Sequence, residues 1–269
     1  MTHSPSRNAL VTGASAGIGE AYATALAKDG FNLILTARRQ DKLDELAGKL
    51  ESTHGIKTLV LPADLGSAAA PAELMQQIQD AGWTVDYLVN NAGYGVGGQY
   101  TSNEWQTHST FMQVMVNAVL ELTYLALPGM QARGYGRVAN VASLAGLMPS
   151  TAGHTLYGAC KSFLIKFSES LSAENREFGV HVCAVCPGFT YSEFHDVAGT
   201  REQVSQMASY MWQTADEVVA EGIKATEQGK SYYVTGRVNR FLAWLGRHLP
   251  RGLLNKLMEN KAKQFRNAD

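Results

Sequence analysis

The chain has 269 residues, a formal net charge of -1 and hydrophobic residues at 45% of its positions, a composition typical of one globular unit with a substantial core. Because the overall charge is nearly zero, the chain is not expected to bind nucleic acid. Its small and odd number of cysteines suits a reducing compartment, and residues 1–8 lack the basic start and apolar centre of a signal peptide. Since no run of about eighteen apolar residues occurs, no membrane span is predicted, and the expected location is cytoplasmic.

Strand-like and helix-like segments alternate along the chain. The pattern predicts strands over residues 8–14, 31–38, 57–65, 85–93, 136–146, 180–189 and 231–236. Helices are predicted over residues 17–30, 40–55, 70–82, 103–134, 156–179 and 215–229. This alternation predicts an α/β fold, a Rossmann-type doubly wound sheet of about seven parallel strands with helices on both faces. Residues 1–236 are expected to form this domain, and residues 237–269 a helical extension of it.

The first strand-to-helix turn is rich in glycine. It reads LVTGASAGIGE, with Gly13, Gly17 and Gly19 between the first predicted strand and the first helix. Glycine allows a sharp turn and a close approach of the backbone to a ligand. The helix that follows presents free N–H groups and the positive end of its dipole, which suit phosphate. The spacing differs from the usual G-x-G-x-x-G fingerprint, so this turn alone would be weak evidence for a dinucleotide site.

Four further motifs follow in order. They are Asn90-Asn-Ala-Gly93 after the fourth predicted strand, Ser143 after the fifth, Tyr157-Gly-Ala-Cys-Lys161 on a helix, and Pro187-Gly188 with Thr190 after the sixth strand. Together with TGASAGIG, they give the chain a resemblance to the short-chain dehydrogenase/reductases over residues 8 to about 236. The resemblance implies a nicotinamide cofactor and hydride exchange between a carbonyl and a secondary alcohol. It implies cofactor contacts from Gly13, Ser15, Gly17, Ile18, Gly19, Asn91, Ala92, Gly93, Tyr157, Lys161, Pro187, Gly188 and Thr190.

The expected catalytic residues are Tyr157, Lys161, Ser143 and Asn117. Tyr157 and Lys161 are four residues apart on a helix, so they share a face, and a nearby ammonium would lower the pKa of the phenol. Ser143 would hydrogen-bond the substrate oxygen, although a serine there could also cap a helix. Asn117 resembles the family asparagine that holds a water beside the lysine, and a structural role for its amide stays open.

The end of the second predicted strand bears on the choice of cofactor. Ala37 stands where an NAD-preferring protein usually has an acidic residue, and Arg38 and Arg39 follow it. Guanidinium groups suit a 2′-phosphate, so NADP(H) is the predicted cofactor. Asp64 and Leu65 resemble the family pair that contacts adenine, although Asp64 could also be an ordinary cap.

The substrate is expected to be a small and mainly apolar carbonyl compound or alcohol. Its predicted contacts are Ser143, Tyr157, Tyr94, Met148 and Phe189, and residues 188–213 are expected to form an apolar cover over it. Residues 237–269 mix apolar and basic residues, which leaves three interpretations open: a cap on the cleft, a subunit contact, or a membrane-surface helix. Family habit suggests a homodimer or homotetramer.

Two rival interpretations remain at this level. A member of the family without activity could bind a nucleotide as a sensor or scaffold, although this chain keeps the whole Ser, Tyr and Lys set. The C-x-x-C spacing of Cys183 and Cys186 could indicate redox or metal chemistry. On a buried strand, however, residues three apart point to opposite faces, so we expect two core cysteines and no metal site.

Overall fold

The computed structural model describes residues 7–150, 152–153, 155–191, 209–250 and 252. Among them, seven strands form one parallel sheet in the order β3-β2-β1-β4-β5-β6-β9. These strands are β1 (Asn8–Thr12), β2 (Asn32–Thr36), β3 (Thr58–Val60), β4 (Tyr87–Asn90), β5 (Gly136–Val141), β6 (Val180–Cys186) and β9 (Tyr232–Val234). The predicted doubly wound α/β fold is confirmed. The strand order reverses between β1 and β4, which places a ligand crevice at the carboxyl ends of these two strands.

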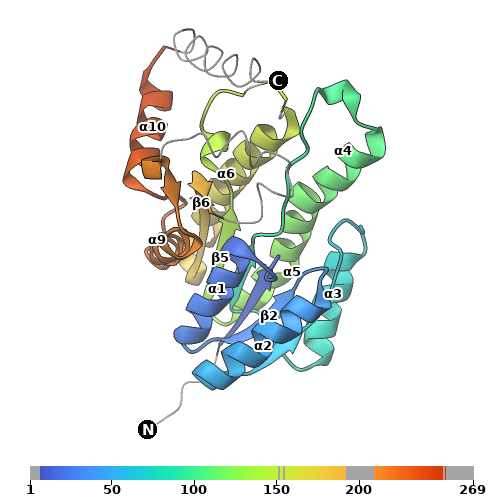
Figure 1. The fold of residues 1–269 in the computed structure, drawn as a ribbon. Coiled ribbons are helices and arrows are strands. Elements are labelled where there is room, and N and C mark those ends of the chain that lie inside the picture. The colour runs from blue at the N-terminus through green and yellow to red at the C-terminus, as the bar shows by residue number, and fades with distance from the viewer. Residues whose placement is uncertain (1–6, 151, 154, 192–208, 251, 253–269) are drawn as a thin grey trace.

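Helices cover both faces of the sheet, as Figure 1 shows. The helices are α1 (Gly17–Lys28), α2 (Gln40–His54), α3 (Ala70–Asp80), α4 (Trp105–Met112), α5 (Ala118–Ala132), α6 (Thr155–Asn175), α9 (Ala215–Glu227) and α10 (Arg237–His248). Apolar residues of α1, α2 and α9 pack on one face, and those of α3 and α5 on the other. The rest of the described structure is short: the 3-10 turns η1 (Tyr100–Ser102), η3 (Leu144–Gly146), η4 (Arg176–Phe178) and η5 (Ser209–Met211), and the paired strands β7 (Phe189–Thr190) and β8 (Trp212–Gln213).

The two cysteines of the C-x-x-C pattern lie in different parts of the core. Cys183 packs in the cluster that includes α1 and α9, and Cys186 packs in the cluster that includes α6. Both thiols are free, and burial raises the pKa of each. A thiol reacts as the thiolate, and the raised pKa keeps both of these thiols protonated. The two cysteines are therefore packing residues, as the strand geometry predicted.

The predicted helix over residues 103–134 contains a π turn. Between α4 and α5 the chain forms the π turn η2 (Gln113–Asn117), which adds one residue to a helical turn and rotates the side chains around the axis. The whole stretch Trp105–Ala132 is long and apolar enough to cross a membrane, but more than half of its most apolar part is buried inside the fold. Because α5 forms the core on one face of the sheet, its apolar character is explained by packing.

Candidate active site

The glycine-rich turn has the geometry that a phosphate site requires. Gly13 and Gly17 have φ values of 65° and 59°, in the left-handed region that favours glycine. A Cβ on Gly19 would overlap the carbonyl oxygen of Gly13, so only glycine lets α1 start this close to the turn. The first turn of α1 has no side-chain cap, because Ala16 occupies the N-cap position. Its N–H groups are therefore available to an anion.

The segment after β4 is tied to this turn by side-chain hydrogen bonds. The Thr12 hydroxyl accepts from the backbone N–H groups of Asn91 and Ala92 at 2.9 and 3.0 Å, and donates to the Val89 carbonyl at 3.1 Å. The Asn91 amide donates to the carbonyls of Thr12 and Gly13 at 3.0 and 3.2 Å. Two of the predicted cofactor segments are thus held as one rigid unit. Thr12 is a residue that the sequence analysis did not single out.

The end of β2 leads to the same edge of the site. Arg39 extends across the glycine-rich turn and donates from Nη2 to the Ser15 carbonyl at 3.3 Å and to the Ser15 hydroxyl at 3.2 Å. Arg38 is exposed, and its charge, with that of Asp64, acts on the phenol of Tyr94. The structure therefore gathers the predicted 2′-phosphate residues, Asp64 and Tyr94 at one end of the crevice.

Leu65 and Tyr94 have packing roles as well. Leu65 is buried in the core beside α3, so only its backbone can reach a ligand. Tyr94 packs edge-to-face on Phe111, with ring centroids 5.5 Å apart, and burial raises the pKa of its hydroxyl. Its position near Arg38 and Asp64 places Tyr94 between the predicted cofactor and substrate regions.

Ser143, Tyr157 and Lys161 come together at the carboxyl end of β5. Tyr157 and Ser143 share a side-chain hydrogen bond that lowers the pKa of the phenol, but burial is the larger influence and raises that pKa to about 12. Lys161 is buried, donates to the Val141 carbonyl at 2.7 Å, and burial lowers its pKa to about 8. Ser143 also caps η3 by accepting from the Ala145 N–H at 3.1 Å, so its expected capping role is present, and its role towards the substrate oxygen stays a prediction.

Asn117 is the last residue of the π turn η2. Its side chain is exposed, and its amide donates to Gln113 Oε1 at 3.1 Å. In the same π turn, Val114, Met115 and Val116 are buried. Met115 packs against Gly93: a Cβ on that glycine would lie 2.8 Å from the Met115 sulfur. This turn directs Met115 into the core and leaves the Asn117 side chain open to solvent, and the role expected for Asn117 in holding a water beside Lys161 stays a prediction.

The helical spacing of apolar residues identifies Met115 as a core residue of this segment. Phe111, Met115, Val119 and Leu122 recur at intervals of three or four and are all buried, whereas Asn117 lies off this stripe. The resemblance to the family concerns Asn117, whereas the apolar stripe contains Met115. Met115, which supports the Gly93 turn, is the residue that this signal would have found.

A second missed feature is a buried network of amides behind the site. Asn90 donates to Asn140 Oδ1 at 2.8 Å and to the Thr123 hydroxyl at 3.1 Å. Asn140 in turn donates to the Ser168 hydroxyl at 2.9 Å. The network joins β4, β5, α5 and α6, and so fixes the strands that carry the NNAG segment and Ser143 relative to the helix that carries Tyr157.

The segment after β6 completes the described site and contacts α10. Leu144 N–H donates to the Pro187 carbonyl at 2.8 Å, and the buried Thr190 hydroxyl donates to the Gly188 carbonyl at 3.2 Å. A Cβ on Gly188 would overlap the amide of Asn239 on α10. Pro187, Gly188 and Thr190 thus lie between the sheet and the first part of the C-terminal extension.

The predicted substrate residues surround this segment. Phe189 packs on Trp212 with ring centroids 5.6 Å apart, and Met148 lies against α10, its sulfur 3.0 Å from a Cβ built on Gly246. The parts of the predicted cover over residues 192–208 and of the extension over residues 253–269 lie outside the described residues. Among the residues that are described, no cluster of three or more His, Cys, Asp or Glu side chains could hold a metal ion.

These features fit a dinucleotide. The left-handed Gly13 and Gly17, the close approach at Gly19 and the uncapped first turn of α1 form a cradle for a pyrophosphate. Ser143 follows β5, and Tyr157 and Lys161 lie beside it on α6, at the same carboxyl edge of the sheet, where a bound ring and its substrate would meet. The fold and the site therefore define a nucleotide-dependent oxidoreductase of the Rossmann type.

Comparison with known proteins supports this assignment. The family model described as short chain dehydrogenase matches residues 7–203. A very-long-chain 3-oxoacyl-CoA reductase from Anas platyrhynchos is 30% identical over 268 residues, covering 96% of this chain and 80% of that protein. The ketoacyl reductase HetN of Nostoc sp. is 34% identical over 189 residues, covering 70% of this chain and 65% of that protein.

A solved structure is similar over nearly the whole chain. A short-chain dehydrogenase from Sphingobium yanoikuyae in complex with NADPH has a TM-score of 0.78 and 28% sequence identity, and covers 93% of this chain and 95% of that one. On these matches, the chain belongs to the short chain dehydrogenase family.

Proposed function

We propose that this protein is an NADP(H)-dependent oxidoreductase that interconverts a carbonyl and a secondary alcohol on a mainly apolar substrate. The observation that carries the proposal is the placement of the Ser143 hydroxyl beside the phenol of Tyr157, whose pKa it lowers, with Lys161 one turn further along the same helix as Tyr157. Two hydroxyls held together at the carboxyl edge of the sheet offer two hydrogen bonds to one substrate oxygen. A carbonyl so held is polarised and correctly placed to receive a proton.

The protonation states favour Tyr157 as the proton donor. With a pKa of about 12 its phenol keeps its proton at neutral pH, and with a pKa of about 8 most of Lys161 is a cation there. In the reductive direction the carbonyl carbon receives the hydride that a reduced nicotinamide supplies when bound. The oxygen takes the phenol proton, and the resulting phenolate is stabilised by the nearby ammonium. Oxidation of the alcohol is the same step reversed.

The preference for NADP(H) rests on Arg38 and Arg39. No acidic side chain stands at Ala37, and Arg39 extends over the glycine-rich turn to Ser15. A guanidinium at this edge gives a 2′-phosphate charge-assisted hydrogen bonds that a 2′-hydroxyl cannot match. The NADPH complex of the similar Sphingobium yanoikuyae protein supports the same choice.

The proposed substrate is mainly apolar, because apolar side chains favour binding of apolar groups. Phe189, Met148 and Leu156 are half-buried, Leu156 packs on the same apolar cluster as Tyr157, and two relatives are named as a very-long-chain 3-oxoacyl-CoA reductase and a ketoacyl reductase. We therefore propose ketones with apolar chains, including 3-oxoacyl thioesters, as the first candidate substrates.

The test is a screen of NADPH oxidation with ketones, aldehydes, 3-oxoacyl thioesters and steroids. Tyr157→Phe is the matched control, because it removes one hydroxyl and keeps the ring. We expect turnover by the native protein, a loss of roughly 10²-fold or more in the variant, and similar NADPH binding by both. If the variant retains full turnover, the proton-donor role is wrong. If the native protein binds NADPH but reduces no carbonyl, the protein is a nucleotide-binding sensor or scaffold.

The proposal includes association of copies of the chain. Tyr124 and Leu125 on α5 and Phe163 on α6 are exposed, with Tyr124 at 74%. Aromatic side chains exposed to this degree favour burial against another copy. Light scattering after size-exclusion chromatography should give a dimer or tetramer, and Tyr124→Lys should shift it towards the monomer. A cytoplasmic location is also part of the proposal, supported by the three free cysteines.

A further inference from the structure

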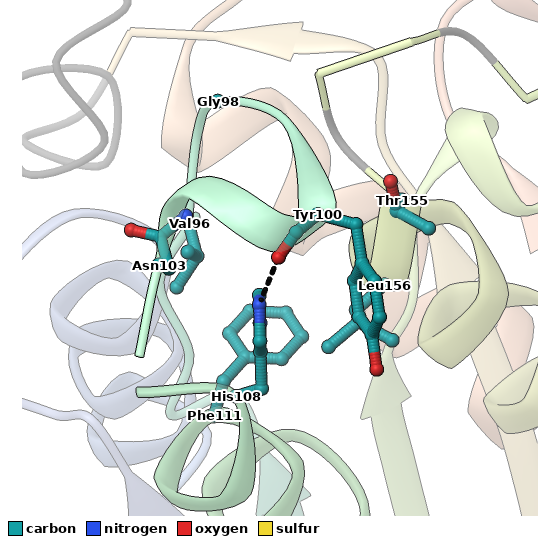
Figure 2. Close-up of a pocket in the computed structure, with 8 residues that line it drawn as sticks. All are labelled: Val96, Gly98, Tyr100, Asn103, His108, Phe111, Thr155 and Leu156. Atoms are coloured by element: carbon teal, nitrogen blue, oxygen red, sulfur yellow. Dashed lines mark hydrogen bonds between the residues drawn. The ribbon is translucent and has the colours of Figure 1, made fainter. Parts of the chain in front are cut away.

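A small hollow lies beside the catalytic tyrosine and contains an unusual histidine. Its lining includes Val96, Phe111 and Leu156, together with His108 of α4 (Figure 2). Leu156 directly precedes Tyr157, and Val96, Leu156 and Tyr157 pack around the same apolar cluster as Phe111 and Met115. The hollow is therefore next to the region where the proposed function places the substrate.

The hydrogen bond made by His108 fixes the role of each ring nitrogen. Its Nε2 lies 2.7 Å from the carbonyl oxygen of Tyr100, as Figure 2 shows. A carbonyl oxygen only accepts, so Nε2 carries the proton and donates it. In the neutral imidazole the other nitrogen, Nδ1, then has a lone pair and no proton. Nδ1 can accept a hydrogen bond from an O–H or N–H group, and cannot donate one.

That acceptor is buried and unused. His108 is 6% exposed, and Nδ1 is a buried atom without a hydrogen-bond partner among the described residues. A buried polar atom left unpaired costs free energy, so such atoms generally have a reason to be there. The ring itself is well fixed, because it stacks on Tyr100 with centroids 4.7 Å apart as well as bonding its carbonyl.

The other groups around the hollow define what would fit. Val96, Phe111 and Leu156 are apolar, and Asn103 is already engaged, since its amide donates to the Gly97 carbonyl at 3.0 Å. Thr155, at the rim, is exposed to solvent. Among the side chains that line the hollow, His108 has a buried ring nitrogen without a hydrogen-bond partner, in a wall that is otherwise mostly apolar.

From this arrangement we propose that His108 is a specificity-determining residue, which accepts a hydrogen bond from a hydroxyl carried by an apolar substrate away from its reacting carbonyl. The inference rests on the proposed carbonyl chemistry and adds the substrate class: hydroxy ketones and the corresponding diols. A hydroxyl donates to Nδ1, whereas the same position bearing a methyl ether or a hydrogen leaves Nδ1 unpaired. A site with a buried unpaired partner discriminates strongly against a ligand that lacks the matching group.

The test compares substrates that differ only in that donor. Straight-chain methyl ketones of increasing length are compared with the same ketones bearing a terminal hydroxyl and with the methyl ethers of those hydroxy ketones. For the native protein we expect kcat/KM to favour the hydroxyl over the ether by about tenfold at the chain length that reaches His108. Similar values for hydroxyl and ether at every length would overturn the inference.

Two variants separate the acceptor from the fold. His108→Phe keeps a ring that can stack on Tyr100 and removes the Nδ1 acceptor, so the ratio of hydroxyl to ether should fall to about one. Asn103→Ala alters another polar group of the same hollow and should keep the ratio of the native protein. Each ratio is taken within one variant, so a general loss of activity cancels. If His108→Phe keeps the native ratio, His108 has a structural role only.

A binding measurement distinguishes failure of the inference from failure of the proposed function. Calorimetry with the terminal hydroxy ketones and their ethers needs no turnover. Tighter binding of the hydroxyl compound that is lost in His108→Phe supports the inference even if no carbonyl is reduced. Equal binding of both compounds by the native protein contradicts it, whatever the activity.

Discussion

The ammonium of Lys161 lies 5.7 Å from the centre of the Tyr157 ring and donates to the Val141 carbonyl at 2.7 Å. The sequence analysis expected this ammonium to lower the pKa of the phenol. In the structure, burial is the largest influence on both groups: it raises the pKa of Tyr157 to about 12 and lowers that of Lys161 to about 8. The cost of burying the lysine charge is therefore part of the stability of the fold, and it can be measured.

Lys161→Met should change how stability depends on pH. Between about pH 8 and 10.5 the unfolded chain still binds the lysine proton and the folded chain has released it, so the native protein gains stability as pH rises. Relative to Lys161→Met, the free energy of unfolding of the native protein should rise by about 3 kcal/mol across this window. Urea denaturation at a series of pH values measures it.

The control for this prediction is another lysine of α6. The side chain of Lys166 is 80% exposed, so Lys166→Met should leave a difference from the native protein that does not vary in this way. A constant difference between the native protein and Lys161→Met from pH 7 to 10.5 would show that burial does not disfavour the Lys161 charge.

Replacing the two arginines after β2 should alter the choice of nicotinamide. Arg39→Ala and Arg38→Ala should each weaken NADPH binding, by roughly 10-fold or more for a lost charge-assisted hydrogen bond, and change NADH binding little. NADPH fluorescence titration gives both affinities, and Arg237→Ala, an exposed arginine at the start of α10, is the control. Equal losses for the two dinucleotides would place the arginines away from the 2′-phosphate.

Ser143 and Asn117 should differ widely in their effect on turnover. Ser143→Ala removes the hydroxyl that bonds Tyr157, and kcat should fall by roughly 10²-fold or more. Asn117→Ala removes an exposed amide whose partner is Gln113, so we expect kcat within about twofold of the native value. Steady-state kinetics on one substrate compares them. If kcat falls as far in Asn117→Ala as in Ser143→Ala, the Asn117 side chain takes part in proton transfer.

The sequence was sufficient for the fold because its signals are local and repeated. Alternating apolar segments, and glycines such as Gly30 and Gly55 with left-handed φ values at the ends of α1 and α2, mark elements without reference to the rest of the chain. The predicted strands ran beyond the observed ones, as at β3, which spans only Thr58–Val60. The residues that follow β3 lie outside its bounds but still hydrogen-bond the end of β2, with Leu61 N–H donating to the Leu35 carbonyl and Ala63 N–H to the Ala37 carbonyl.

The positions of site residues could be predicted where the spacing of a motif fixes them, but not where contacts between distant segments fix them. The positions of Gly13, Ser143, Tyr157 and Lys161 follow from strand ends and helical spacing. The orientation of Asn117 depends on a π turn, which the helical spacing of apolar residues does not predict. The contact of α10 with Gly188 depends on a chain segment fifty residues away, so no local pattern contains it.

That last contact should couple α10 to the site. A Cβ on Gly188 would overlap the Asn239 amide, which is buried and donates to the Thr235 carbonyl at 2.9 Å. Gly188→Ala should therefore destabilise the fold by about 1–3 kcal/mol, because either the turn or α10 must move. The same displacement shifts Phe189 and should raise KM for the substrate. Urea unfolding and steady-state kinetics measure the two effects.

A double-mutant cycle with Asn239→Ala tests whether the contact itself is responsible. Removing the Asn239 amide makes room for the new methyl group. The loss of stability in the double variant should therefore be smaller than the sum of the two single losses, by about 1 kcal/mol or more. Gly48→Ala is the control: a Cβ there meets nothing within 4 Å, and alanine in the middle of α2 should stabilise by roughly 0.5–1 kcal/mol. Strict additivity of Gly188→Ala and Asn239→Ala would show that α10 is not seated on the turn after β6. Coupling in both stability and KM would make the first part of the C-terminal extension a cap that holds the Pro187-Gly188 turn in place beside the substrate.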